Sequence, residues 1–158
     1  MADITFNVAK GRINELVNRV NDNDPANSAL IVVLLQASET DATLQDYDNL
    51  SLLLAAAGNT EATFTNYARK VLSDTDIAAP TVDDTANTQW SDIPDQVYTS
   101  AGGATNNTLT KLLVCYDSDT TGGDDTNIIP LTAQDFSATT TGSDMTAVIS
   151  ATGFFSAS

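Results

Sequence analysis

A continuous apolar segment in the first quarter of the chain constrains the fold most. The segment ALIVVLLQA spans residues 29–37 and is built almost entirely from aliphatic side chains, several of them β-branched. A run of this length and composition is typical of a strand that is buried on both faces. Other elements must then cover each face of that strand. The sequence therefore predicts a layered structure around an internal strand.

The segment before this strand has helical periodicity. Apolar residues recur at i, i+3, i+4 and i+7 from Ile13 to Val20, and Glu15 and Arg19 lie between them. This spacing predicts an amphipathic helix, which Pro25 and the polar residues before it would end. A strand that runs into a hairpin is the alternative for residues 10–21.

A second helix is expected after the apolar strand. Ser38 or Thr40 can cap its start, and Asp41 places negative charge near the positive end of the helix dipole. Gly58 would follow the helix as the residue after its end. The predicted apolar stripe of this helix consists of Tyr47, Leu50, Leu53, Leu54 and Ala57.

From residue 63 onward the pattern changes to β. Residues Ala78–Asp95 are the exception, and they are expected to form an irregular connection around Trp90. These observations predict a single α+β, predominantly β domain over residues 1–158, softly divided into a mixed part (1–75) and a β-rich part (76–158). A small sandwich or partly open barrel is expected in the C-terminal half, and one or two helices in the N-terminal half. The predicted strands are Phe64–Leu72, Gln96–Thr99, Leu109–Tyr116, Ile128–Thr132, Met145–Ser150 and Gly153–Ala157.

The charge balance restricts the partners of the chain. With 21 acidic and 6 basic residues among 158, the formal net charge is −15. Such a surface repels nucleic acid and anionic lipid headgroups, so neither is an expected partner. A basic partner surface and simple solubility by charge remain as alternatives. The sequence has no apolar stretch long enough to cross a bilayer and no secretory signal pattern at its start.

Residue types argue against catalysis. The chain has no histidine, no GxxxxGK[ST] or GxGxxG sequence, and one cysteine, Cys115, within an apolar run. This excludes histidine-dependent triads and phosphate-cradling loops, and Cys115 is expected to be a small buried hydrophobe. A carboxylate pair would need a pocket with sugar-stacking aromatic residues, whereas aromatic residues are only 6% of the chain. We therefore expect no enzyme activity and no cofactor.

One acidic segment resembles the start of a calcium loop. Asp117, Asp119, Thr121 and Asp125 supply oxygen atoms at spaced positions, with Gly122 at the bend. The twelfth position, which should be a bidentate glutamate, is Ile128. An acidic hairpin turn, in which Gly122 and Gly123 adopt positive φ, is therefore favoured over a metal site.

Three aromatic residues are candidates for contacts. Trp90 would either fill the core or anchor a partner, and the core is the favoured place. Phe154 and Phe155 follow Gly153 in the last predicted strand. Because side chains alternate across a strand, one ring should face inward and the other outward. The outward ring would need cover from the N-terminal part or from a neighbouring subunit.

Six stretches form a pattern that runs through most of the chain. They are NVAKGR (7–12), NDPANSALIVVLL (23–35), FTNYARKVLSD (64–74), DDT (83–85), KLLVCYDSDTTGGDDTNIIPLTAQDF (111–136) and ATGFFSAS (151–158). In the same order, they resemble a group of small tailed-phage proteins that are described as virion structural or head-associated proteins. The resemblance implies a location in a virion and assembly into a symmetric shell or tail, and it carries no catalytic or metal residues.

The resemblance and the charge together lead to a specific expectation. A −15 domain suits the outer wall of a capsid rather than the wall that faces DNA, so we expect a decoration or cement subunit, made in the host cytoplasm. It would bind the phage major capsid protein and copies of itself. The strands Asp3–Ala9 and Gly153–Ala157 are the expected edges that pair with neighbours, and deletion of residues 1–9 should then abolish particle binding without unfolding. The expected interface residues are Ile4, Phe6, Lys10, Arg12, Trp90, Phe154 and Phe155.

The sequence is also compatible with two other functions. A tail component, such as an adaptor, tube or fibre-base protein, would have a similar fold and composition. An adsorption or carbohydrate-binding β-domain would need an aromatic-lined cleft.

Overall fold

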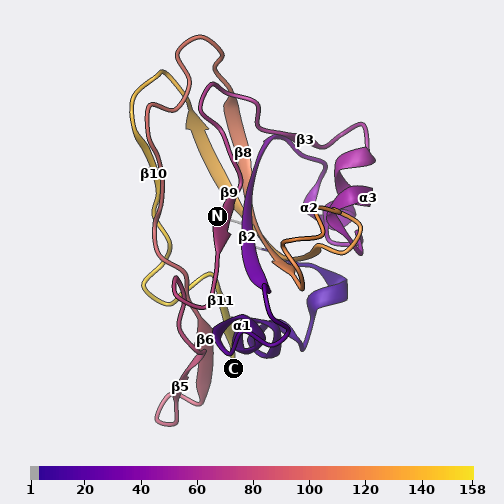
Figure 1. Cartoon of the computed structure of the whole chain (residues 1–158), viewed down its shortest axis with the longest axis vertical. Coiled ribbons are helices and arrows are strands. Elements are labelled where there is room, and N and C mark those ends of the chain that lie inside the picture. The colour runs from indigo at the N-terminus through magenta and orange to yellow at the C-terminus, as the bar shows by residue number, and fades with distance from the viewer. Residues whose placement is uncertain (1–3) are drawn as a thin grey trace.

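A computed structural model of the chain describes residues 4–158, and its largest element is an antiparallel sheet (Figure 1). Strand β2 lies inside this sheet, next to β8, and β9 lies on the other side of β8. The order β1-β9-β8-β2-β3 is completed by β4, which pairs with β2 on the same side as β3. The bounds are Ile4–Thr5 (β1), Ala29–Ala37 (β2), Thr60–Glu61 (β3), Lys70–Leu72 (β4), Thr108–Asp117 (β8) and Ile129–Thr139 (β9).

The predicted internal strand is confirmed. Residues 29–35 are all buried, so both faces of β2 are covered. Its backbone pairs with β8 over seven positions, from Ala29 opposite Asp117 to Leu35 opposite Lys111. This ladder places Leu34 and Leu112 opposite each other, and because side chains alternate along a strand, Lys111 points to the other face of the sheet.

The predicted first helix is also confirmed, and the hairpin alternative for residues 10–21 is wrong. Helix α1 (Ile13–Asn21) buries Ile13, Leu16, Val17 and Val20. It follows a short 3₁₀ helix, η1 (Asn7–Ala9), which stands where a continuous first strand was expected. The exposed face of α1 carries an ion pair between Arg19 and Glu15 at 2.9 Å.

The prediction of a single second helix is wrong, because two short helices occupy that segment. They are α2 (Asp41–Leu44) and α3 (Leu50–Ala55). Asn49 accepts a hydrogen bond from the Leu52 amide and so caps α3, which favours a new helix start over continuation. The predicted apolar stripe ends early, since Ala57 is exposed. Gly58 does not have the positive φ of a residue that closes a helix.

Different elements cover the two faces of the main sheet. Helices α2 and α3 lie on one side, and strands β7 and β10 lie on the other (Figure 1). A β5–β6 hairpin projects at one end of the molecule (Figure 1). Strand β7 (Gln96–Tyr98) pairs with β10 (Met145–Ala147), and β6 (Thr88–Ser91) lies between β5 (Thr81–Asp83) and β11 (Phe155–Ala157).

Several other segment predictions are wrong in part. The strands predicted at Met145–Ser150 and Gly153–Ala157 are limited to Met145–Ala147 and Phe155–Ala157. Within Phe64–Leu72 only Lys70–Leu72 forms a strand, because Asn66 adopts a positive φ and turns the chain. Phe64 and Tyr67 pack instead against Tyr98, with ring centroids 6.0 and 6.2 Å from the Tyr98 ring. Residues 78–95 are not wholly irregular, since they contain the β5–β6 hairpin.

The predicted fold class, α+β and predominantly β, is confirmed. The several antiparallel sheets do not close into a barrel. The main sheet takes β2 from the first 75 residues and β8 and β9 from the rest, so its central ladder joins the two parts of the chain. None of the helices among residues 4–158 has the length and apolar character needed to cross a bilayer.

The buried position of Phe6 leads to a first prediction. Phe6 is 0% exposed, and its amide donates to the Leu131 carbonyl at 3.0 Å. Phe6→Ala should lower the free energy of unfolding by about 3–5 kcal/mol, because it removes a fully buried ring. Urea unfolding measures this change, with the 60% exposed Val82 replaced by alanine as the control. A loss below about 1 kcal/mol for Phe6→Ala would contradict the placement of this residue.

Candidate functional site

Two of the expected interface strands meet at one groove, which we call the terminal groove. Ile4 and Thr5 of β1 form one part of its wall, and Phe155 and Ser156 of β11 form another. Thr132, Ser150, Thr152, Gly153 and Phe154 complete the lining. The groove has a volume of about 270 Å³. Residues from near the two ends of the sequence therefore lie together on one surface.

Both strands at this groove are sheet edges, as predicted. Among residues 4–158, β1 pairs only with β9, and β11 pairs only with β6. An edge strand keeps backbone amide and carbonyl groups available to a further strand. The part of the predicted first strand at Asp3 lies outside the described residues.

Phe154 and Phe155 are held in place by a close contact at Gly153. Gly153 has φ +77°, and a Cβ atom there would lie 2.1 Å from the Ser91 carbonyl oxygen. The Phe154 amide donates to the same oxygen at 3.0 Å. Phe154 is buried at 8% exposure and Phe155 is half-buried. Because β11 begins at Phe155 and Phe155 packs partly against the buried cluster, the two rings do not alternate within one strand as predicted. Phe154 lines both the terminal groove and a second groove.

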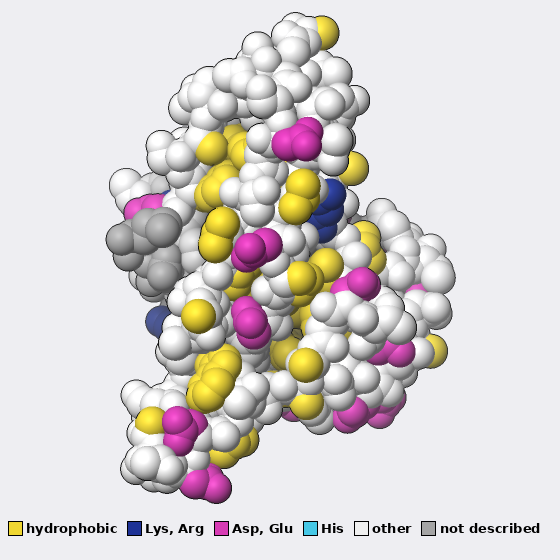
Figure 2. Space-filling model, turned by 90° about the vertical axis from the view of Figure 1, so that its left-hand side faces the viewer, with side chains coloured by type: hydrophobic (Ala, Val, Ile, Leu, Met, Phe, Trp, Pro, Cys, Tyr) yellow, Lys and Arg dark blue, Asp and Glu magenta, His cyan; other side chains and the backbone are white. Residues whose placement is uncertain are grey.

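The second groove, which we call the apolar groove, lies on the side of the main sheet that β7 and β10 cover. Leu112 and Phe136 of the main sheet, residues 147–150 and Phe154 line it, around a volume of about 120 Å³. Figure 2 shows apolar side chains in a band down this face, with acidic side chains between them. Val148 is 75% exposed in this lining. No pattern in the sequence predicts this groove, because its walls come from separate segments of the chain that share no motif.

Gln134, which lines the apolar groove, carries a buried polar atom without a partner among the described residues. Gln134 donates from Nε2 to the Phe154 carbonyl at 3.1 Å and to the Thr132 hydroxyl at 2.9 Å. Nε2 is thus satisfied, whereas Gln134 Oε1 is left buried without a hydrogen-bond partner among the described residues. A buried acceptor of this kind is costly to leave unpaired.

The other expected interface residues differ in their burial. Lys10 and Arg12 are exposed, and Lys10 donates to Asn7 at 2.6 Å. Phe6 is wrong as an interface residue, because it is fully buried in the core. The expectation that Trp90 fills the core is also wrong. Trp90 is half-buried in β6, opposite Ser156 and Thr81, outside the buried cluster, and its role as a partner anchor stays a prediction.

The acidic loop forms turns and does not gather its carboxylates as a calcium loop would. Asp117 accepts from the Asp119 amide at 3.0 Å, and Asp119 accepts from the Thr121 amide and hydroxyl. Those hydrogen bonds from Thr121 lower the pKa of Asp119. Asp125 turns instead to Arg69, and residues 4–158 contain no cluster of three acidic, cysteine or histidine ligands. Gly123 has positive φ, as the turn predicted, whereas Gly122 does not.

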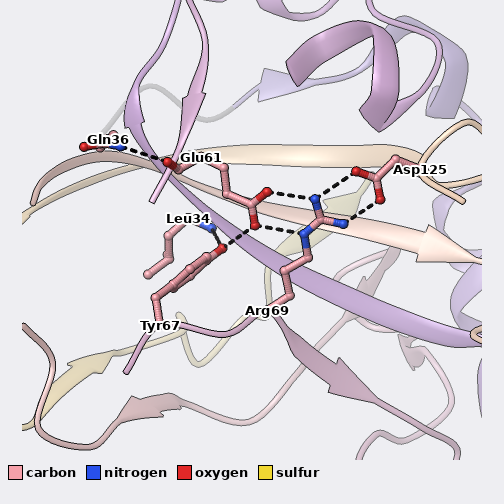
Figure 3. A network of polar contacts seen from close by, with 6 residues as sticks. All are labelled: Leu34, Gln36, Glu61, Tyr67, Arg69 and Asp125. Carbon is pink, nitrogen blue, oxygen red and sulfur yellow. Dashed lines mark hydrogen bonds and ion pairs between the residues drawn. The ribbon is translucent and has the colours of Figure 1, made fainter. Parts of the chain in front are cut away.

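Arg69 joins Glu61 and Asp125 in a network that the sequence analysis did not find (Figure 3). It donates to both oxygens of Glu61 at 2.8 and 2.7 Å, and to both oxygens of Asp125 at 2.6 and 2.9 Å. Tyr67 donates to Glu61 at 2.9 Å and accepts from the Leu34 amide. Hydrogen bonds from the guanidinium to Glu61 and Asp125 raise the pKa of Arg69. With both carboxylates bound by a permanent cation, the network fits structural support rather than acid–base catalysis.

Lys111 is a second cation that is bound by two carboxylates. Lys111 is 5% exposed, and its ammonium group contacts Asp41 and Asp135. Burial lowers the pKa of Lys111, but hydrogen bonds to Asp135 and Asp41 outweigh it, so the pKa is raised. Cys115 is fully buried, and burial raises the pKa of its thiol well above the ordinary value. The prediction that Cys115 is a buried hydrophobe is confirmed.

Comparison of the chain with known proteins found no matching family model, no matching curated protein and no matching solved structure.

The Arg69 network gives a second prediction. Arg69→Met should lower the free energy of unfolding by about 1–3 kcal/mol, because it leaves two partly buried carboxylates facing each other without their cation. Asp125→Asn should cost less, since Glu61 still binds the guanidinium. Urea unfolding at neutral pH measures both. Equal stability of Arg69→Met and the wild type would show that the network contributes nothing to the fold.

Proposed function

We propose that this protein is a structural virion protein, a decoration or cement subunit that binds the outer surface of a phage head. In this role it stabilises joints between major capsid proteins. The terminal groove, where two sheet edges lie together, is the observation that carries the proposal. The resemblance of most of the chain to small head-associated phage proteins supports the choice of partner.

The edge strands give such a subunit a means of attachment. An extended arm of a shell protein that enters the terminal groove can pair with backbone groups of β1 or β11. Main-chain pairing of this kind supplies affinity, and the side chains that line the groove supply selectivity. Because the two edges belong to different sheets, one arm can contact both sheets of the subunit at once.

The charge distribution supports an outward-facing orientation. A net charge of −15 is repelled by packaged DNA. Lys10 and Arg12 are exposed immediately after β1 and η1, in an otherwise acidic molecule. They can meet acidic residues of a shell protein beside the terminal groove. The remaining acidic surface would face solvent and keep neighbouring particles apart.

The copy number of the protein in purified particles tests the proposal. We expect quantitative mass spectrometry to give a ratio to the major shell protein that is near one or a simple fraction of one. A few copies per particle would favour a tail or portal component. Complete absence from the particle would overturn the proposal.

The terminal groove gives a third prediction. Ser156 lines this groove and is exposed, so Ser156→Trp should fill it and lower binding to particles that lack the protein by about tenfold or more. Thr121→Trp adds the same ring to the exposed acidic loop and serves as the matched control. Circular dichroism should show both variants folded. Equal binding by the two variants would remove the terminal groove from the interface. Deletion of residues 1–9 is a poor test, because it also removes the buried Phe6 and Ala9.

The exposed cations give a fourth prediction. The pair Lys10→Glu and Arg12→Glu should slow association with particles by about tenfold at low salt, and added salt should shrink the difference. Surface plasmon resonance on immobilised particles measures these rates. Arg19→Glu is the control, because Arg19 is already paired with Glu15. A rate that does not change with salt would exclude electrostatic steering by Lys10 and Arg12.

A further inference from the structure

We propose that the apolar groove is a docking site for an extended partner segment in which an apolar side chain is flanked by lysine or arginine. This inference rests on the proposed function only for the identity of the partner, since the site itself is argued from the chain alone. It assigns a second contact surface beside the terminal groove.

The groove is small and mostly apolar. Its volume of about 120 Å³ is close to that of an engineered apolar cavity, roughly 150 Å³, that binds benzene. It therefore suits one aliphatic side chain. Leu112, Phe136 and Phe154 supply apolar contacts, and Val148 stands beside the opening with three quarters of its surface exposed. A side chain that enters the groove would cover apolar surface from several of these residues, which favours binding.

Gln134 contributes an unpaired hydrogen-bond acceptor. Gln134 lines the groove, and its Oε1 is buried without a partner among the described residues while Nε2 makes two hydrogen bonds. A bound segment that offers a backbone N–H would satisfy this oxygen once the Gln134 side chain turns toward the groove, and the cost of the unpaired acceptor favours that turn. An occupant of the groove must therefore provide an apolar side chain and a hydrogen-bond donor close together. An extended polypeptide provides both.

The negative charge near the groove favours a cationic occupant. Asp95 accepts from the Ile149 amide at 2.8 Å, so its exposed carboxylate lies beside the groove. The backbone of Asp92, a second residue with an exposed carboxylate, lies against Gly153. Residues 71–158 contain one cation, Lys111, and it is buried and bound to Asp41 and Asp135. A second copy of this chain, with its own charge of −15, is a poor occupant. A cationic segment is complementary to these carboxylates.

The test uses the purified protein and a defined probe, the peptide acetyl-Lys-Val-Lys-Val-Lys-amide. In ¹⁵N–¹H spectra we expect saturable shifts at Val148, Ile149 and Phe154 and at the Gln134 side-chain amide. Val148→Lys should weaken binding by about tenfold, because it removes an apolar contact and adds like charge at the groove. Val82→Lys adds the same charge at a 60% exposed valine on β5 and is the matched control.

The outcomes separate the site from general electrostatics and from the virion proposal. Equal weakening by Val148→Lys and Val82→Lys, shifts spread over the whole acidic surface, or no saturable shift would each overturn the inference. The serine analogue, acetyl-Ser-Val-Ser-Val-Ser-amide, should bind at least about fivefold more weakly if charge selects the occupant. Binding of the wild-type protein to particles is measured in parallel. If the peptide binds as expected and particles do not, the groove stands and the virion proposal falls.

Discussion

The pairing of β2 with β8 is the constraint on which the rest of the structure depends. Seven consecutive residues of β2 are buried, and the ladder to β8 satisfies backbone groups that have no access to water. A strand buried on both faces forces a layer on each side of the sheet. Helices α2 and α3 form one cover, and the small sheets with β7, β10 and β11 take part in the other. The grooves exist because this second cover consists of short separate strands that leave spaces between them.

The two internal cations fasten connections to this sheet rather than forming a reactive centre. Lys111 lies on β8 and holds Asp41, the first residue of α2, so it attaches the helical cover to the sheet. Arg69 precedes β4 and holds Asp125, so it attaches the long β8–β9 connection beside the β3–β4 segment. In both cases two carboxylates share one cation, which is buried at Lys111 and half-buried at Arg69. This arrangement keeps charge neutralised where water is scarce.

Local patterns predicted the elements whose burial is set by their own sequence. The run at 29–37 and the spacing from Ile13 to Val20 gave the internal strand and α1, because burial of those faces is visible as periodicity. The break between α2 and α3 was missed, although Asn49 is a residue type that caps helices. The segment from Phe64 to Arg69 was missed for a different reason: its aromatic residues pack on Tyr98, more than 30 residues away, and that contact overrides strand propensity.

The sequence predicted part of the candidate site, namely the residues in its edge strands, but not the contacts between distant segments. Ile4, Phe154 and Phe155 were expected in two edge strands, and the structure brings these three residues to the terminal groove. The partners of Arg69 and Lys111 could not be predicted, since Asp125 and Asp41 lie 56 and 70 residues away in the chain. The apolar groove likewise depends on β9 and the segment after β10 lying together, which no local pattern encodes.

The shared residues of the two grooves have a physical consequence for binding. Ser150, Gly153 and Phe154 line both grooves. Phe154 is fixed from both sides, by its amide on Ser91 and by its carbonyl on Gln134. A segment in either groove would contact this one ring, which these hydrogen bonds and its 8% exposure already hold in place. Segments that fill both grooves would therefore pack against a common wall that is already ordered, and neither would meet a large ordering cost at Phe154.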